Sequence, residues 1–112
     1  MELATLYSIL NQSFQDKVFY GTNAYDNEDN VSMPFIVYQE VTKRPAHFSD
    51  DKVKFYRSSV QITLVTKSKN LTLEKKLEKA LLDNNLAFSL LSESQNEDKS
   101  VNRVYEIYME EI

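Results

Sequence analysis

The clearest pattern in the sequence is an alternation of apolar and polar positions in the segment YRSSVQITLVTK, which begins at Tyr56. Val60, Ile62 and Leu64 are apolar, and the positions between them are polar. Successive side chains of a strand point to opposite faces, so this alternation predicts a strand with one buried face and one polar face. The same alternation recurs twice nearer the C-terminus and predicts two further strands. Their apolar positions are Leu86, Phe88, Leu90, Tyr105, Ile107 and Met109.

Two other segments have apolar residues at the spacing of an amphipathic helix. The first predicts a helix near the N-terminus that ends before Lys17. Its apolar residues are Leu3, Leu6, Tyr7, Leu10 and Phe14. The second helix is expected to bury Leu73, Leu77, Ala80 and Leu81 and to end at residues 83–85. Ser68, Asn70 or Thr72 can cap it, because each offers a side-chain oxygen to free backbone N–H groups.

The segments before the alternating strand predict two more strands. Residues 18–20 predict a short strand that ends at Gly21. Pro34 then begins a strand rich in β-branched and aromatic residues. Its first apolar residues fall on both faces, so we expect it to be covered on both sides at its start. These residues are Phe35, Ile36, Val37 and Tyr38.

Three polar segments are expected to lie outside the strands. Residues 43–52 predict a loop or a projecting hairpin tip, and residues 92–100 predict a turn. Because recognition is commonly carried by loops on a rigid scaffold, we expect the polar loops at 21–33 and 43–54 to contact partners.

The predicted order of elements is helix, short strand, strand, strand, helix, strand, strand. Two amphipathic helices packed on a mainly antiparallel sheet of four to five strands make an α+β, two-layer fold. With 112 residues and no linker or internal repeat, the whole chain, residues 1–112, is expected to form one domain.

Composition excludes several classes of function. The absence of Cys rules out disulfides and thiolate metal sites, and a single Gly leaves no glycine-rich phosphate loop. A net charge of −4 is poorly suited to wrapping nucleic acid, because phosphates require clustered Lys and Arg. No apolar run is long enough to cross a membrane, and the N-terminal segment lacks the basic region of a signal peptide, so we expect no membrane association.

Candidate catalytic residues are few. His47 is the single histidine, and we expect it to be an exposed loop residue, because no second His or Cys could complete a zinc site with it. The acidic run around Asp26 and Glu28 fails as a calcium loop, since Val31 and Val37 occupy the positions of the required Gly and Glu. We therefore expect no enzymatic activity, no catalytic residues, no metal and no cofactor.

The aromatic content points instead to protein contacts. The chain has seven Tyr and six Phe, more than a core built mostly of Leu, Ile and Val requires. Arg57 follows Phe55 and Tyr56, and Arg with aromatic residues is typical of interface hot spots. The alternative is that Arg57 lies on the solvated face of the sheet. The candidate interface residues are Tyr25, Phe48, Asp50, Asp51, Phe55, Tyr56, Arg57, Glu110 and Glu111.

Six segments follow one another in an order and spacing that cover nearly the whole chain. They are L-x-x-L-Y-x-x-L, K-V-F-Y-G, P-F-I-V-Y-Q-E-V, R-S-S-V-Q-I-T-L-V-T-K, L-E-K-K-L-E-K-A-L and R-V-Y-E-I-Y-M. This succession resembles the tail-completion or tail-terminator proteins of long-tailed bacteriophages, also called head-to-tail joining proteins.

The resemblance implies a structural protein of the virion neck. Proteins of this family form a hexameric ring that caps the tail tube, meets the head connector and leaves a channel through which DNA passes without specific binding. The expected partners are then other copies of the chain, the tail tube protein and the connector or stopper, in the virion and, during assembly, in the host cytoplasm. Two alternatives remain open: another neck component, such as a stopper or adaptor, and a small host ligand-binding or regulatory domain.

Overall fold

The computed structural model describes residues 1–21, 33–49 and 52–111, with the backbone alone at 46–49, 52–54 and 111. Within these ranges the chain forms two helices and five strands in the order that the sequence predicts, and the α+β, two-layer fold class is confirmed. The elements are α1 (Leu3–Ser13), β1 (Val18–Tyr20), β2 (Phe35–Ser49), β3 (Lys52–Thr66), α3 (Leu71–Asp83), β4 (Phe88–Gln95) and β5 (Val101–Glu111).

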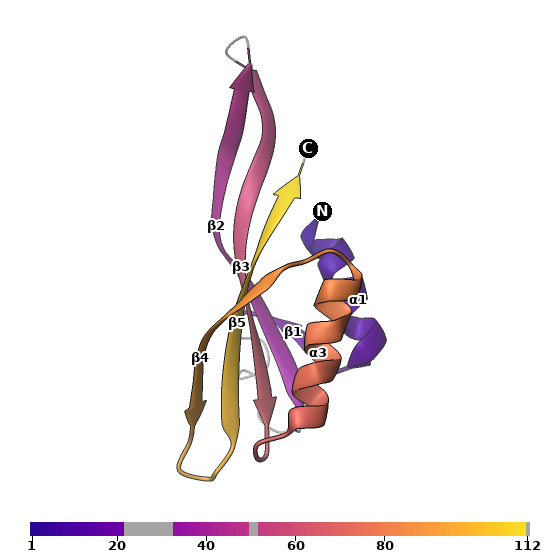
Figure 1. Cartoon of the computed structure of the whole chain (residues 1–112), viewed down its shortest axis with the longest axis vertical. Helices are drawn as coiled ribbons and strands as arrows, with labels where there is room; N and C mark the ends of the chain where they lie inside the picture. The colour runs from indigo at the N-terminus through magenta and orange to yellow at the C-terminus, as the bar shows by residue number, and fades with distance from the viewer. Residues whose placement is uncertain (22–32, 50–51, 112) are drawn as a thin grey trace.

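The five strands form one mixed sheet in the order β1-β2-β3-β5-β4. β1 is parallel to β2, and the other neighbouring strands are antiparallel. The pairing of β2 with β3 runs from Phe35 opposite Val65 to Ser49 opposite Lys52. These two strands therefore form one long hairpin, which extends beyond the helices (Figure 1).

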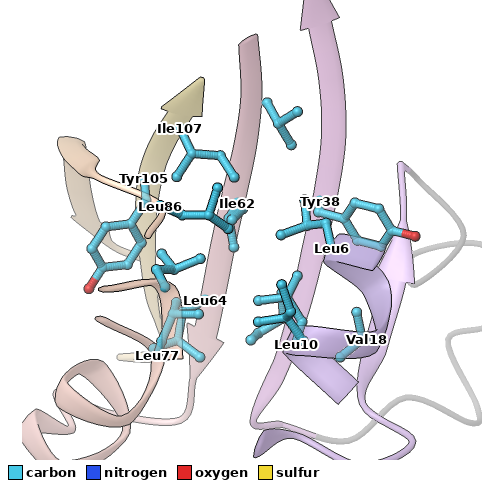
Figure 2. Packing of buried hydrophobic residues seen from close by; sticks show 14 of the residues in the cluster. Leu6, Leu10, Val18, Tyr38, Ile62, Leu64, Leu77, Leu86, Tyr105 and Ile107 are labelled. Carbon is cyan, nitrogen blue, oxygen red and sulfur yellow. The ribbon is translucent and has the colours of Figure 1, made fainter. Parts of the chain in front are cut away.

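Both helices cover the same face of the sheet, and the main core lies between the two layers (Figure 1). The alternating residues of β3 and β5 point into this core, as predicted. Ile62 and Leu77 are both fully buried in it, which confirms that the middle strand and the second helix share one interior (Figure 2). The cluster consists of Leu6, Ile9, Leu10, Phe14, Val18, Ile36, Tyr38, Val60, Ile62, Leu64, Leu77, Leu81, Leu86, Tyr105, Ile107 and Met109.

A smaller apolar cluster lies on the opposite face of the sheet. Phe35, Val37 and Val65 are buried there, with Phe19 and Met33 packed against them. The expectation that β2 is covered on both sides at its start is therefore confirmed. The polar face predicted for β3 ends at Thr63, because the next residue on that face, Val65, is part of this cluster.

Local signals explain where α3 begins and ends. Asn70 is the cap among the three candidates, since its side chain accepts a hydrogen bond from the backbone N–H of Leu73 at 3.1 Å. The helix ends at Asp83, and Asn85 adopts a positive φ of 61°, a conformation that Asn tolerates better than most residues.

Three sequence expectations about segment limits and burial are wrong wholly or in part. Residues 43–49 and 52–54 are strand, so the loop expected over 43–54 is wrong and the alternative, a projecting hairpin, is confirmed. β4 continues to Gln95, which confines the turn that was expected over 92–100 to its second half. Leu90 is 45% exposed rather than buried, because it lies on β4, the edge strand of the sheet, although its partner Tyr105 on β5 is fully buried.

Candidate interaction surface

The β2–β3 hairpin projects from the domain without a core of its own. The molecule measures 54 × 27 × 24 Å, and the hairpin forms one end of its long axis (Figure 1). The last buried residue before the hairpin tip in β2 is Tyr38, and the first described side chain of β3 that is buried is Ser58. We call residues 39–57 the projecting hairpin. Most of its described side chains are exposed, including the five consecutive ones at 41–45.

A bulge marks the point where the hairpin leaves the body. Glu40 pairs with Val60, but Thr42 pairs with Ser59, so Val41 is an extra residue in β2. Bulges bend a strand and increase its twist, and they change the side to which the following residues point. Val41 itself is 51% exposed. The bulge therefore sets which hairpin side chains face away from the helices.

An open groove of about 550 Å³ lies at the base of the hairpin, and we call it the hairpin-root groove. Three strands of the sheet contribute to it. Its lining residues are Val41, Thr42, Arg44, Pro45, Arg57, Ser59, Glu106 and Tyr108. Because β2 and β3 contribute residues on both sides of the bulge, the groove depends on the hairpin and on the body together.

A row of three charged residues crosses the sheet at this groove. Arg44 is directly opposite Arg57 in the β2–β3 pairing, and Arg57 is directly opposite Glu110 in the β3–β5 pairing. Directly opposite residues of a sheet share a face, so the three side chains leave the sheet on the same side. Arg57 donates a hydrogen bond to Glu110 at 3.1 Å, and both side chains are more than half exposed.

Glu106 accepts hydrogen bonds from Ser59 and Tyr108, the next pair of residues on this face of β3 and β5. Its carboxylate accepts a hydrogen bond from the Ser59 hydroxyl at 3.2 Å and another from the Tyr108 hydroxyl at 2.9 Å. The second bond raises the pKa of Tyr108, because the phenol must keep its proton to donate to a carboxylate. Tyr108 nevertheless leaves 60% of its surface in solvent. Glu106 thus fixes an exposed aromatic ring beside the Arg pair.

The candidate interface residues predicted from the sequence are only partly brought together. Arg57 and Glu110 meet, but within one chain rather than between copies. Tyr56 neighbours Arg57 along the strand and therefore points to the opposite face, where the Lys43 ammonium lies 5.2 Å from its ring centre. Phe55 is two residues before Arg57 in the strand, so its side chain lies on the same face as that of Arg57. A contact of these residues with a second copy stays a prediction.

The remaining candidates lie outside what the structure describes. Tyr25, Asp50 and Asp51 fall outside the described ranges, and at Phe48 and Glu111 only the strand backbone is described. The His47 side chain and residues 22–32 of the loop expected over 21–33 also lie outside the described structure.

Arg44, Glu106 and the groove position of Tyr108 were missed by sequence reasoning. Residues 41–45 are all exposed, so no apolar alternation in the sequence could have revealed the position of Arg44.

A second hollow, of about 740 Å³, lies on the other side of Arg57. It runs along the part of β5 that follows the last pairing with β4, Phe88 with Ile107. Its lining residues are Met1, Arg57, Asn84, Asn85, Leu86, Tyr108, Met109 and Glu110. The N-terminal amino group donates a hydrogen bond to the backbone carbonyl of Glu110, so the chain's own N-terminus covers part of this strand edge.

A separate cluster of charged groups joins α3 to β4 and β5. Arg103 donates to Glu93 at 2.9 Å and to Glu78 at 3.4 Å, and it lies 3.5 Å from Glu74. Lys69 donates to Glu74 at 2.9 Å and to Glu93 at 2.8 Å. Each carboxylate thus has a cationic partner, so the cluster is suited to fastening the helix to the sheet.

Tyr105 links the charged cluster to the core. Its ring is fully buried, and Phe88 packs edge-on against it with ring centres 5.3 Å apart. Its hydroxyl donates to Glu78 at 2.6 Å and accepts from Arg103 at 2.6 Å. Burial, followed by the hydrogen bond to Glu78, raises the pKa of Tyr105 well above its usual range. The phenol therefore stays protonated and acts as a fixed donor.

The charged cluster makes stability depend on pH on the acid side. Hydrogen bonds from Lys69 and then Arg103 lower the pKa of Glu93 below its ordinary value. A depressed carboxylate pKa contributes stability above the pKa of the unfolded chain, and this contribution is lost as the pH falls through the folded value. We expect the free energy of unfolding to fall between about pH 5 and pH 3. Urea titrations across this range should show a shallower fall for Glu93→Gln.

Glu97→Gln is the matched control for this prediction. Glu97 lies exposed in the turn between β4 and β5, and no hydrogen bond or ion pair links its side chain to another described residue. Its removal should leave the slope of stability against pH unchanged. Equal slopes for both variants and the parent would contradict a role for Glu93.

Comparison with known proteins and a search for other sites add few constraints. The sequence matches no protein-family model and no curated protein. Among the described residues, no group of three or more His, Asp or Glu side chains is placed to hold a metal ion. Neither described helix has the length and apolar character that a membrane span requires. The projecting hairpin and the groove at its root are the described features that suit contact with a partner.

Proposed function

We propose that this chain is a structural subunit of the neck of a long-tailed bacteriophage. In this role it forms a ring that caps the tail tube, joins the tail to the head connector and leaves a channel for DNA. The resemblance of the sequence to tail-terminator proteins supports this position in the virion, and a net charge of −4 suits a channel that DNA must leave freely.

The projecting hairpin is the observation that carries the assembly part of this proposal. Isolated two-stranded hairpins are at best marginally stable in water, because they bury little surface. The outer edge of β2 pairs with β1 only at residues 36–38, and β5 reaches only as far as Tyr56 along β3. Both edges of the outer hairpin therefore lack a strand neighbour in the described part of the chain. Open edges of this kind favour pairing with another chain.

The hairpin can be shortened without disturbing the body. Pro45 and Tyr56 are paired residues, so replacing residues 46–55 by Asn-Gly should close a two-residue turn between them. The core clusters contain no residue from the deleted segment. We expect the shortened protein to fold with a nearly unchanged melting temperature but to lose ring formation. Sedimentation velocity and negative-stain electron microscopy, with the protein alone and with purified tail tubes, would measure this.

The same experiment separates the competing functions. Rings on the end of the tube that require the hairpin support the tail-terminator role. Binding to the portal or connector but not to the tube would instead assign the chain to a stopper or adaptor. A parent protein that forms no ring and binds neither structure would contradict a neck function. Rings formed equally well by the shortened protein would contradict the role of the hairpin.

A further inference from the structure

Arg44 is the one member of the charged row without an ion-pair partner among the described residues. Arg57 has Glu110 beside it, whereas no hydrogen bond or ion pair connects the Arg44 side chain to another described residue. Like charges directly opposite each other on a sheet are destabilising. Arg44 and Arg57 are such a pair, and both line the hairpin-root groove. The isolated chain therefore keeps an unfavourable arrangement that a bound carboxylate would relieve.

The residues on the rim of the groove are also of the kind found at protein–protein interfaces. Val41 is 51% exposed and Tyr108 is 60% exposed on its rim. Interfaces gain most from Arg and Tyr held in position beside apolar surface. Glu106 already holds the Tyr108 hydroxyl at 2.9 Å, so this ring needs little ordering when a partner binds.

Charge distinguishes a polypeptide carboxylate from a nucleic acid as the occupant. Glu106 and Glu110 lie next to the two arginines, so these four side chains sum to zero charge. A polyanion would meet both carboxylates, whereas a single carboxylate can approach Arg44 and Arg57 without meeting them. Nucleic-acid sites instead gather several Lys and Arg without acidic neighbours.

The distribution of charge along the chain favours a second copy. The projecting hairpin has five basic residues (Lys43, Arg44, Lys52, Lys54 and Arg57) and three acidic residues (Glu40, Asp50 and Asp51), a net charge of +2. The whole chain has 13 basic and 17 acidic residues, so the rest has a net charge of −6. The hairpin of one copy is thus attracted to the body of another. A contact between two different surfaces does not close a symmetric dimer but repeats from copy to copy, and it forms a ring where the rotation closes.

We propose that the hairpin-root groove is a self-association site in which Arg44 and Arg57 bind a carboxylate from the body of a neighbouring copy. This inference rests on the proposed function and deepens it, because it names the surface through which the subunits meet.

Arg44→Glu tests the inference without endangering the fold. The introduced carboxylate would lie opposite Arg57, and an opposite-charge pair replaces a like-charge pair, so the melting temperature should stay the same or rise. Self-association should nevertheless weaken about tenfold or more, because the charge-assisted hydrogen bonds to the partner are lost. Lys75→Glu makes the same change of charge on the exposed side of α3 and should associate like the parent.

Sedimentation velocity, with amide NMR titrations up to millimolar concentration, would measure association at low and high salt. The parent is expected to associate in a salt-sensitive manner, with shifts at Thr42, Arg44 and Arg57 that are absent in Arg44→Glu. A parent that stays monomeric, or an Arg44→Glu variant that associates equally well, would overturn the inference. So would binding of a short labelled DNA duplex that Arg44→Glu abolishes. A failure of the proposed function would be detected separately, by ring formation on tail tubes. The hairpin deletion belongs to that separate test, because it keeps both arginines.

Discussion

Replacing Leu77 by Ala should lower the free energy of unfolding by about 2–5 kcal/mol, because removing buried methylenes leaves a cavity that the structure fills only in part. Leu77 is fully buried at the centre of the interface between α3 and the sheet (Figure 2). Ile62, in the middle of β3, is fully buried in the same cluster. Ile62→Ala should therefore cost a similar amount. Urea denaturation followed by circular dichroism would measure both values.

Leu82→Ala is the matched control on the same helix. Leu82 neighbours the buried Leu81 but leaves 56% of its surface in solvent. The substitution removes the same atoms without opening a cavity, so we expect a change of about 0.5 kcal/mol or less. If Leu77→Ala and Ile62→Ala were no more costly than Leu82→Ala, the assignment of one shared core would be wrong.

Burial explains which parts of the fold were predictable. Val60, Ile62 and Leu64 alternate because the helices cover one face of β3, and the stripe through Leu77 and Leu81 exists because α3 covers that face. A buried face imposes its period on the sequence, so elements that touch the core can be recognised from the sequence. Both helices and the strands β3, β4 and β5 were found in this way, whereas β1 and β2 were predicted from Gly21, Pro34 and a run of β-branched and aromatic residues.

The hairpin and the groove were not predictable by the same reasoning. Residues 41–45 are exposed, so no apolar period distinguishes a strand there from a loop. The polar residues Ser92–Gln95 of β4 escaped prediction for the same reason. Arg44 lies opposite Arg57 only because Val41 is an extra residue in β2. The register of the two strands is set by how they pair, so it cannot be read from residue composition. The candidate interface found from the sequence therefore contained Arg57 but not Arg44.

The charged cluster was also hidden from the sequence. Its members come from α3, β4, β5 and the segment before α3, and each alone resembles an ordinary surface charge. Only the packing of α3 against the sheet shows that the Glu74 side chain is 6% exposed and the Arg103 side chain 16% exposed. Because these side chains are buried, removing one of them should lower the free energy of unfolding more than removing an exposed charge.

Arg103→Met should lower the free energy of unfolding by about 3 kcal/mol, near the lower end of the range for breaking a buried ion pair. Met keeps much of the length and the apolar stem of Arg but removes the guanidinium. Glu74 would then depend on Lys69 alone, and Glu78 would keep only the hydroxyl of Tyr105. The cost arises mainly from carboxylates that remain covered without enough positive charge, so neutralising one of them should recover part of it. Arg103→Met combined with Glu74→Gln is therefore expected to be less destabilised than the sum of the two single variants.

Arg57→Met provides the comparison that makes this prediction decisive. It removes the same group from an ion pair, with Glu110 at 3.1 Å, but the two side chains are 57% and 56% exposed. Solvated pairs of this kind contribute about 0–1 kcal/mol, so the stability of the isolated chain should hardly change. Urea denaturation of the two variants side by side would separate the roles of the two arginines. A loss at Arg103 no larger than the loss at Arg57 would show that the cluster between α3 and β5 is solvated in the same way and does not fasten the helix to the sheet.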